Sequence, residues 1–296
     1  MNLRTDLALE KREVIAEKEP DGIICEKIES PDATVTRIEV INEAGEQKLG
    51  KPAGKYITVE MSAFSEDSRI LDGRLEILTE ELARLLPPEG TVLVIGLGNR
   101  DITPDALGPR CCELILATRH INGEVAKSAG LENLRPVASV VPGVLGKTGI
   151  ETAETVKGIA ETIKPAAVIT VDALAARRMS RLGCTVQLAD TGIVPGSGVG
   201  NSRCGLNSRL LGVPVISVGV PTVVDAATLV CDLVENADYA LGDELRRSIE
   251  REGANMMITP KEVDLTVERA SKLVALAINC ALQPHIAPED ILALVS

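Results

Sequence analysis

Aromatic residues are nearly missing from this sequence. One Phe, two Tyr and no Trp among 296 residues exclude an aromatic platform on which nucleic-acid bases or sugars could stack. The chain is nonetheless rich in apolar residues, at 45%, and long enough to bury a substantial core. We therefore expect a core made of Val, Ile, Leu and Ala.

Histidine and paired cysteine motifs are scarce as well. His120 and His285 are the only histidines, and neither lies in a motif typical of a Ser-His or Cys-His nucleophilic site. The seven cysteines are scattered and include no Cys-x-x-Cys pair, which disfavours a structural zinc site and suits a reducing cytoplasm. We expect neither a metal nor a cofactor.

The sequence also lacks a segment that would take it to a membrane. It has no apolar run of about 18 residues and no charged-then-apolar signal at its amino terminus. Its formal net charge of −12 repels nucleic acid and anionic membranes. These absences predict a cytoplasmic protein without nucleic-acid or membrane partners.

The order of apolar runs and amphipathic stretches predicts an α/β fold, in which a mostly parallel central sheet lies between layers of helices. Strands are expected at residues 92–95, 138–141, 166–171, 186–188 and 213–218, and helices at 72–86, 110–120, 152–163, 222–234 and 263–282. Residues 35–41 and 55–60 predict a small additional β hairpin, and the charged residues 1–32 a peripheral lead-in. No repeat or linker divides the chain, so one domain is expected.

The stretch 92–109 organises the chain. A continuous apolar run at 92–95 is typical of a strand buried on both faces, and Gly96 and Gly98 allow a sharp turn after it. A dinucleotide fingerprint is disfavoured because its third glycine position is Asp101, which would repel a pyrophosphate. Asp105 lies in this loop, where α/β sheets usually bind ligands, although it could instead stabilise the following helix.

A second carboxylate follows a second buried strand. Asp172 comes directly after the run 166–171, so two parallel strands would bring Asp105 and Asp172 to the same sheet edge. Two such carboxyl groups share one proton, and the pair can activate water while polarising a carbonyl. The alternative role of Asp172 is to cap an Ala-rich helix after it.

Other polar residues carry weaker signals. Asp190, in an Asp-Thr-Gly tripeptide, is interpreted as structural or as a support to the site. Arg177, Arg178 and Arg181 either bind acidic groups of a substrate or form a solvated helix face. The Gly-Ser-Gly stretch at 196–198 is either a lid or a tight loop.

Several blocks of sequence together resemble the germination protease (spore protease) family of spore-forming bacteria. The matching blocks are residues 4–10, 96–99, 103–109, 171–175, 190–193 and 195–201. The resemblance implies a fold like that of the hydrogenase-maturation proteases and assembly as a homotetramer. It also implies an endopeptidase of the forespore and spore core that degrades small acid-soluble spore proteins at germination, by an atypical aspartate mechanism using Asp105 and Asp172.

The resemblance gives the amino terminus a role. Family members are made as zymogens and cut after an acidic residue that precedes an apolar residue and alanine, which fits residues 5–8. We therefore predict self-processing between Asp6 and Leu7, with residues 1–6 as a propeptide and 7–296 as a single protease domain. An ordinary frayed terminus is the alternative.

Two other functions remain open from the sequence. One is a metal-assisted peptidase that uses the same two carboxylates, although no histidine lies near either of them. The other is an α/β binding protein without catalytic activity.

Overall fold

The buried apolar runs form the middle of a nine-stranded sheet. The computed structural model describes residues 4–121, 127, 133–194, 204–237, 242–253 and 256–295. The strands are β1 (Ile23–Glu29), β2 (Ala33–Val40), β3 (Gly54–Met61), β4 (Val92–Gly96), β5 (Val137–Val140), β6 (Ala167–Ala176), β7 (Thr185–Ala189), β8 (Val215–Asp225) and β9 (Met257–Ile258). Their order is β1-β2-β3-β7-β8-β6-β4-β5, with β9 paired to β8.

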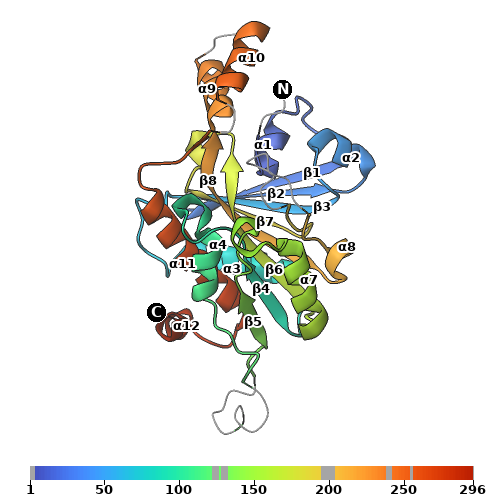
Figure 1. Ribbon diagram of the computed structural model, residues 1–296, viewed down its shortest axis with the longest axis vertical. Coiled ribbons are helices and arrows are strands. Elements are labelled where there is room, and N and C mark those ends of the chain that lie inside the picture. Colours follow the sequence, from blue (N-terminus) through green and yellow to red (C-terminus); the bar gives the residue numbers. More distant parts are fainter. Residues whose placement is uncertain are drawn as a thin grey trace.

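Helices cover both faces of this sheet (Figure 1). They are α1 (Ala8–Glu13), α2 (Glu43–Leu49), α3 (Gly73–Leu85), α4 (Leu107–Glu113), α6 (Leu145–Thr148), α7 (Thr152–Ile163), α8 (Ser208–Leu211), α9 (Ala226–Asn236), α10 (Asp243–Glu252), α11 (Val263–Leu282) and α12 (Pro288–Val295), together with the 3₁₀ turns η1 (Thr103–Asp105) and η2 (Met179–Arg181). The predicted α/β class, with a central sheet between helices, is confirmed.

The sheet is parallel in one half and antiparallel in the other. Strands β5, β4, β6 and β8 pair in parallel, as expected of strands joined by helical crossovers. Strands β1, β2, β3 and β7 pair antiparallel, and β7 joins β8 antiparallel. The predicted hairpin at 35–41 and 55–60 is therefore part of the main sheet, which makes the antiparallel share larger than the sequence suggested.

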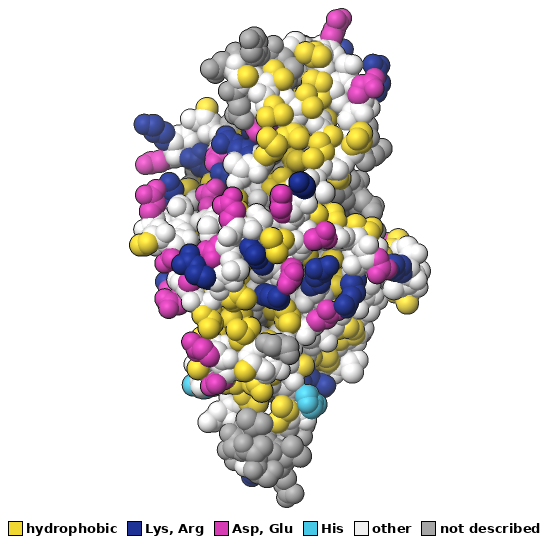
Figure 2. Space-filling model, turned by 90° about the vertical axis from the view of Figure 1, so that its left-hand side faces the viewer, with side chains coloured by type: hydrophobic (Ala, Val, Ile, Leu, Met, Phe, Trp, Pro, Cys, Tyr) yellow, Lys and Arg dark blue, Asp and Glu magenta, His cyan; other side chains and the backbone are white. Residues whose placement is uncertain are grey.

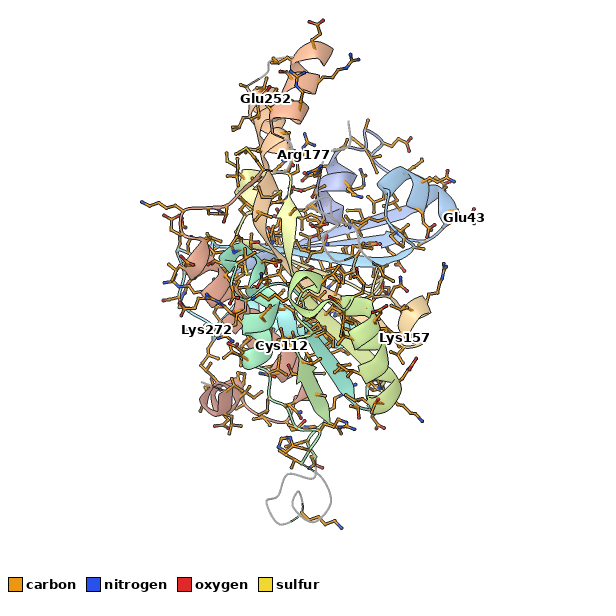
Figure 3. The ribbon with its side chains drawn as sticks, in the orientation of Figure 1. Glu43, Cys112, Lys157, Arg177, Glu252 and Lys272 are labelled. Carbon is orange, nitrogen blue, oxygen red and sulfur yellow. The ribbon has the colours of Figure 1, made fainter. Side chains whose placement is uncertain are left out.

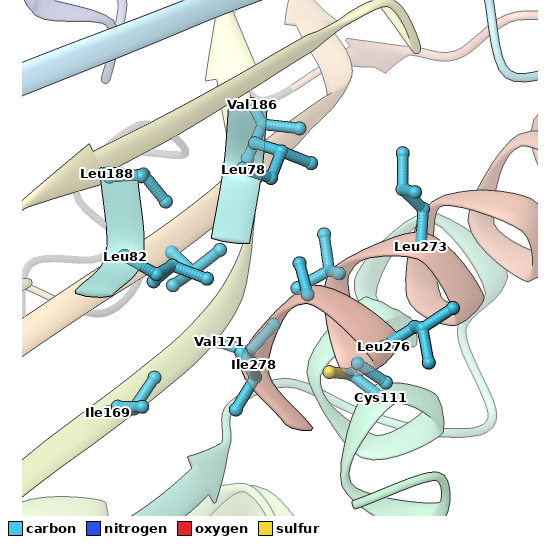
Figure 4. Packing of buried hydrophobic residues seen from close by; sticks show 14 of the residues in the cluster. Leu78, Leu82, Cys111, Ile169, Val171, Val186, Leu188, Leu273, Leu276 and Ile278 are labelled. Carbon is cyan, nitrogen blue, oxygen red and sulfur yellow. The ribbon is translucent and has the colours of Figure 1, made fainter. Parts of the chain in front are cut away.

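Alternate residues of each central strand enter different layers of the core, because side chains alternate across a strand. Along β6, Ile169 and Val171 pack against α3, α4 and α11 (Figure 4), whereas Val168 joins the cluster under α7. Burying one such side chain contributes about 1.5–3 kcal/mol. The strands that carry the site are thus fixed from both sides.

Most predicted helices begin and end where the sequence indicated. The helix expected at 72–86 is α3, with Asp72 as its N-cap, and those at 152–163 and 263–282 are α7 and α11. The helix predicted at 110–120 is wrong in both bounds, since α4 spans Leu107–Glu113. It ends early because the amides of Thr118 and Arg119 bond to Val137 of β5 instead.

The prediction of a helix over 222–234 is also wrong at its start. Strand β8 continues to Asp225, because Val223 and Val224 pair with the extended end of β6, and α9 begins only at Ala226. Helices α9 and α10 then project away from the sheet (Figure 1).

The charged lead-in is not peripheral. Residues 23–29 form the edge strand β1, and Leu7 and Ala8 are fully buried. Helix α1 packs over β2 and β3, where Leu9 joins a small core cluster.

Charged side chains of both signs are interspersed over the middle of the molecule in Figure 2, whereas hydrophobic side chains gather towards the projecting helices. The exposed large hydrophobic residues of that region are Val230, Leu233, Leu245 and Met256. Among the helices of the described residues, none is both long and apolar enough to cross a membrane.

Candidate active site

The loop after β4 places Asp105 against the end of β6. Gly98 has φ +110°, and a Cβ there would come within 2.0 Å of the Asp105 carbonyl oxygen. Only glycine permits this conformation and this close approach. The Asn99 amide donates a hydrogen bond to the Asp105 carboxylate (2.7 Å), and the Thr222 hydroxyl of β8 donates to the Pro104 carbonyl (2.7 Å). The turn that carries Asp105 is therefore held from two directions.

Asp172 lies inside β6 and does not precede a helix. The strand continues to Ala176, so Asp172 does not take the alternative role of capping a helix. Its side chain is 7% exposed and accepts a hydrogen bond from the Ala173 amide (2.9 Å). Burial raises the pKa of Asp172 well above its ordinary value, and the neighbouring carboxylates of Asp105 and Asp6 raise that pKa further.

The loop after β4 stays close to β6 because the backbone hydrogen bonds between the two strands continue one residue past the end of β4. The Leu97 amide donates to the Val171 carbonyl (2.8 Å). Gly108 fits between these two residues, where a Cβ would lie 2.4 Å from the Val171 carbonyl oxygen. The electrostatic coupling of Asp105 with Asp172 follows from this packing.

The amino-terminal segment lies across the same region. The Asp6 amide donates to the Ala175 carbonyl of β6 (2.9 Å), and the Ala175 amide donates to the Asp6 carboxylate (2.9 Å). Leu7 is fully buried in a pocket formed by Leu174, Ala176, Leu182 and Ile193. The Asp6–Leu7 bond is thus enclosed next to β6.

Gln187 of β7 holds the backbone of this segment. Its side-chain amide group donates to the Asp6 carbonyl (3.1 Å), and its side-chain oxygen accepts from the Ala8 amide (2.6 Å). The sequence gave no reason to single out Gln187, because its role depends on the approach of a segment that is distant in the chain.

Arginines 177, 178 and 181 surround the start of α1. Glu10 is 1% exposed and accepts from the backbone amides of Arg177 (2.6 Å) and Arg178 (2.9 Å). Arg181 bonds to Glu13 and Glu60, and its guanidinium lies 3.5 Å from Glu10. These residues are not on a solvated helix face, and Figure 3 shows Arg177 between α1 and α9. The acidic groups that they meet belong to the same chain.

Asp190 lies directly after β7, away from Asp105 and Asp172. Its carboxylate accepts from the Lys55 amide (2.7 Å) and ties β7 to β3. The segment 196–198 that follows in the chain falls outside the described residues.

The donor set for a metal is incomplete. Among the described residues, no three His, Cys, Asp or Glu side chains gather in a way that could hold a metal ion.

The chain is similar to known proteins along almost its whole length. The sequence model of the germination protease family matches residues 4–252. A germination protease of Clostridium perfringens is 40% identical, with 98% of both chains covered. One of Caldanaerobacter subterraneus is 40% identical, covering 98% of this chain and 97% of its own, and one of Bacillus cereus 35% identical, covering 96% and 95%.

Among solved structures, the [NiFe] hydrogenase maturation protease HycI of Thermococcus kodakarensis matches 67% of this chain and 98% of its own, at 17% identity and a TM-score of 0.35.

Proposed function

Because this chain belongs to the germination protease family, we propose that it is the endopeptidase that hydrolyses small acid-soluble spore proteins during germination. Asp105 and Asp172 would act as an atypical aspartate-type pair. The observation that carries this proposal is the buried carboxyl group of Asp172, 7% exposed, whose pKa is raised by burial and by the neighbouring Asp105.

The two carboxyl groups take different parts in the proposed reaction. Asp105, whose carboxylate accepts the Asn99 amide, removes a proton from the attacking water. Asp172, whose pKa is raised by burial, supplies the proton that the leaving nitrogen needs. No step is assigned to a metal, because the described residues offer no third ligand.

Residues 1–6 are proposed as a propeptide that the protease removes from itself by cutting between Asp6 and Leu7. The pocket around Leu7 and the full burial of Ala8 support a requirement for an apolar residue followed by alanine. Residues 7–296 remain as one protease domain.

We further propose that the protein works as a homotetramer in the forespore and spore core. The exposed apolar side chains near α9 and α10 are suited to burial against further copies.

The test replaces each carboxyl group by its amide. Purified Asp105→Asn and Asp172→Asn chains are incubated with a small acid-soluble spore protein, and cleavage is followed by mass spectrometry. We expect at least about a 10³-fold loss of rate in each variant, because the water is no longer activated or the leaving group is no longer protonated. Full activity in both variants would contradict an enzymatic role for the pair and favour a binding protein.

A second arm adds a strong chelator to the unmodified protein. We expect the rate to be unchanged. A complete loss that a divalent metal restores would favour the metal-assisted alternative.

A further inference from the structure

Gln187 contacts the bond that the proposed self-processing would break. Its side chain spans from the Asp6 carbonyl to the Ala8 amide, and the side chain of Leu7 between them is buried in its own pocket. A side-chain amide here mimics a neighbouring strand, which binds an extended peptide by one carbonyl and one amide.

The sheet register places Gln187 and Asp172 on opposite sides of one glycine. Gly219 of β8 pairs with Asp172 of β6 and with Gln187 of β7. Paired residues project from the same face of a sheet, about 4.8 Å apart per strand. Gly219 has no side chain of its own, and the side chain of Leu174, which also lines the Leu7 pocket, occupies the space that a Cβ of residue 219 would take.

From this arrangement we infer that Gln187 is a catalytic residue, whose side-chain N–H group binds the carbonyl oxygen of the bond being cut. The inference rests on the proposed function, since it takes Asp6–Leu7 as that bond. It adds a second group that polarises the carbonyl, besides the protonated member of the carboxyl pair. The side-chain oxygen of Gln187 in turn accepts a hydrogen bond from the amide of Ala8, two residues after Asp6.

The reaction then balances as follows. The oxygen of water bonds to the carbonyl carbon of residue 6, one water proton passes to the Asp105 carboxylate, and the carbonyl π electrons move to the oxygen held by Gln187. When the tetrahedral intermediate collapses, the C–N bond breaks and the Leu7 nitrogen takes the proton of Asp172. A new carboxyl group remains on Asp6, and a new amino group on Leu7. A single oxyanion donor typically contributes about 10²–10³-fold to such a rate.

The experiment compares Gln187→Glu with Gln187→Met in the full-length chain, following the first-order rate of cleavage between Asp6 and Leu7 by mass spectrometry. Glutamate keeps the acceptor for the Ala8 amide but, when ionised, lacks the donor. We expect Gln187→Glu to process about 10²–10³-fold more slowly than the unmodified chain, while hydrogen exchange still shows a protected Ala8 amide.

The pH dependence of the relative processing rate distinguishes a catalytic role of Gln187 from a purely structural one. A protonated glutamate again offers an O–H donor to the Asp6 carbonyl, with the carboxyl groups of Asp6 and Asp172 as its ionisable neighbours. The rate of Gln187→Glu relative to the unmodified chain should therefore rise as the pH falls. The relative rate of Gln187→Met should stay low at every pH.

Thr58→Val is the matched control. Thr58 pairs with Gln187 in the sheet and is fully buried, and its hydroxyl has no hydrogen-bond partner within the described residues. We expect it to process at the unmodified rate. Processing of Gln187→Glu within about threefold of the unmodified rate would overturn the role of Gln187. Processing of Asp172→Asn at the unmodified rate would instead overturn the proposed function.

Discussion

At the scale of single residues, the buried carboxyl group of Asp172 lowers the stability of the fold, whereas an apolar side chain in its place would not. Its carboxyl group lies in the interior beside the carboxylates of Asp105 and Asp6, and all three features raise its pKa. A folded-state pKa above the unfolded value means that folding becomes less favourable as the pH rises between the two values. The stability of the protein is thus reduced at neutral pH by the group that the proposed reaction needs.

Asp172→Asn should therefore stabilise the fold while it abolishes activity. Asparagine keeps an oxygen for the Ala173 amide but never ionises. Below about pH 4, where an unfolded Asp172 is itself protonated, the two proteins should unfold at the same temperature. As the pH rises towards 7, the variant should become more stable by about 1 kcal/mol.

Thermal unfolding across this pH range measures the difference. Asp101→Asn is the control, because Asp101 is exposed and its pKa is lowered by Lys147. Its replacement should therefore make the fold slightly less stable as the pH rises, which is the opposite of the effect expected for Asp172→Asn. An Asp172→Asn variant that is less stable at pH 7 than at pH 4, relative to the unmodified protein, would contradict the burial argument.

At the scale of elements, the glycines around β4 decide where Asp105 lies. Gly98→Ala combines a disfavoured positive φ with a Cβ only 2.0 Å from the Asp105 carbonyl oxygen. The loop must shift, and the proposed base with it. A displacement of about 1 Å costs on the order of 10²-fold in rate, so we expect at least that loss in spore-protein cleavage.

Gly158→Ala is the matched comparison for Gly98→Ala. Gly158 lies inside α7, and nothing lies within 4 Å of an added Cβ. Alanine there should preserve the rate and raise the unfolding free energy by about 0.5–1 kcal/mol. Equal activity of Gly98→Ala and Gly158→Ala would show that the position of Asp105 does not depend on the glycine turn.

Elements with a strong local pattern were predictable, and those that depend on a distant partner were not. Helix α11 has its apolar periodicity throughout and was predicted at both ends. Strand β1 was missed because it is an edge strand whose residues after Ile23 are exposed. The start of the helix at 222 was wrong because its residues extend β8 by pairing with β6.

The same division applies to the candidate site. Asp105 and Asp172 were predictable as a pair because each follows a buried apolar run. Asp105 raises the pKa of Asp172, and the catalytic role of the two residues stays a prediction. Gln187 and Glu10 were not, because each is defined by what another segment places beside it.

At the scale of the whole molecule, distant parts of the chain hold the amino-terminal segment in place. Arg4 forms an ion pair with Asp225 at the β8–α9 junction (3.0 Å), residue 6 bonds to β6, and Glu13 bonds to Arg181. Asp225 also accepts a hydrogen bond from the Thr228 amide at the start of α9. The same carboxylate therefore contacts both the amino-terminal segment and the projecting helices. The proposed cleavage site is thus presented to the site of the same chain.

This arrangement predicts that self-processing is intramolecular. The first-order rate constant should stay the same over a 100-fold dilution, because the Asp6–Leu7 bond is already bound beside Asp172. In a mixture, unmodified chains should leave full-length Asp172→Asn chains uncleaved over the time in which they process themselves, because each chain holds its own segment against β6 and β7. Mass spectrometry distinguishes the two chains directly. A rate constant that falls in proportion to concentration, or rapid cleavage of Asp172→Asn by its active neighbours, would mean that the segment leaves β6 and β7 before it is cut.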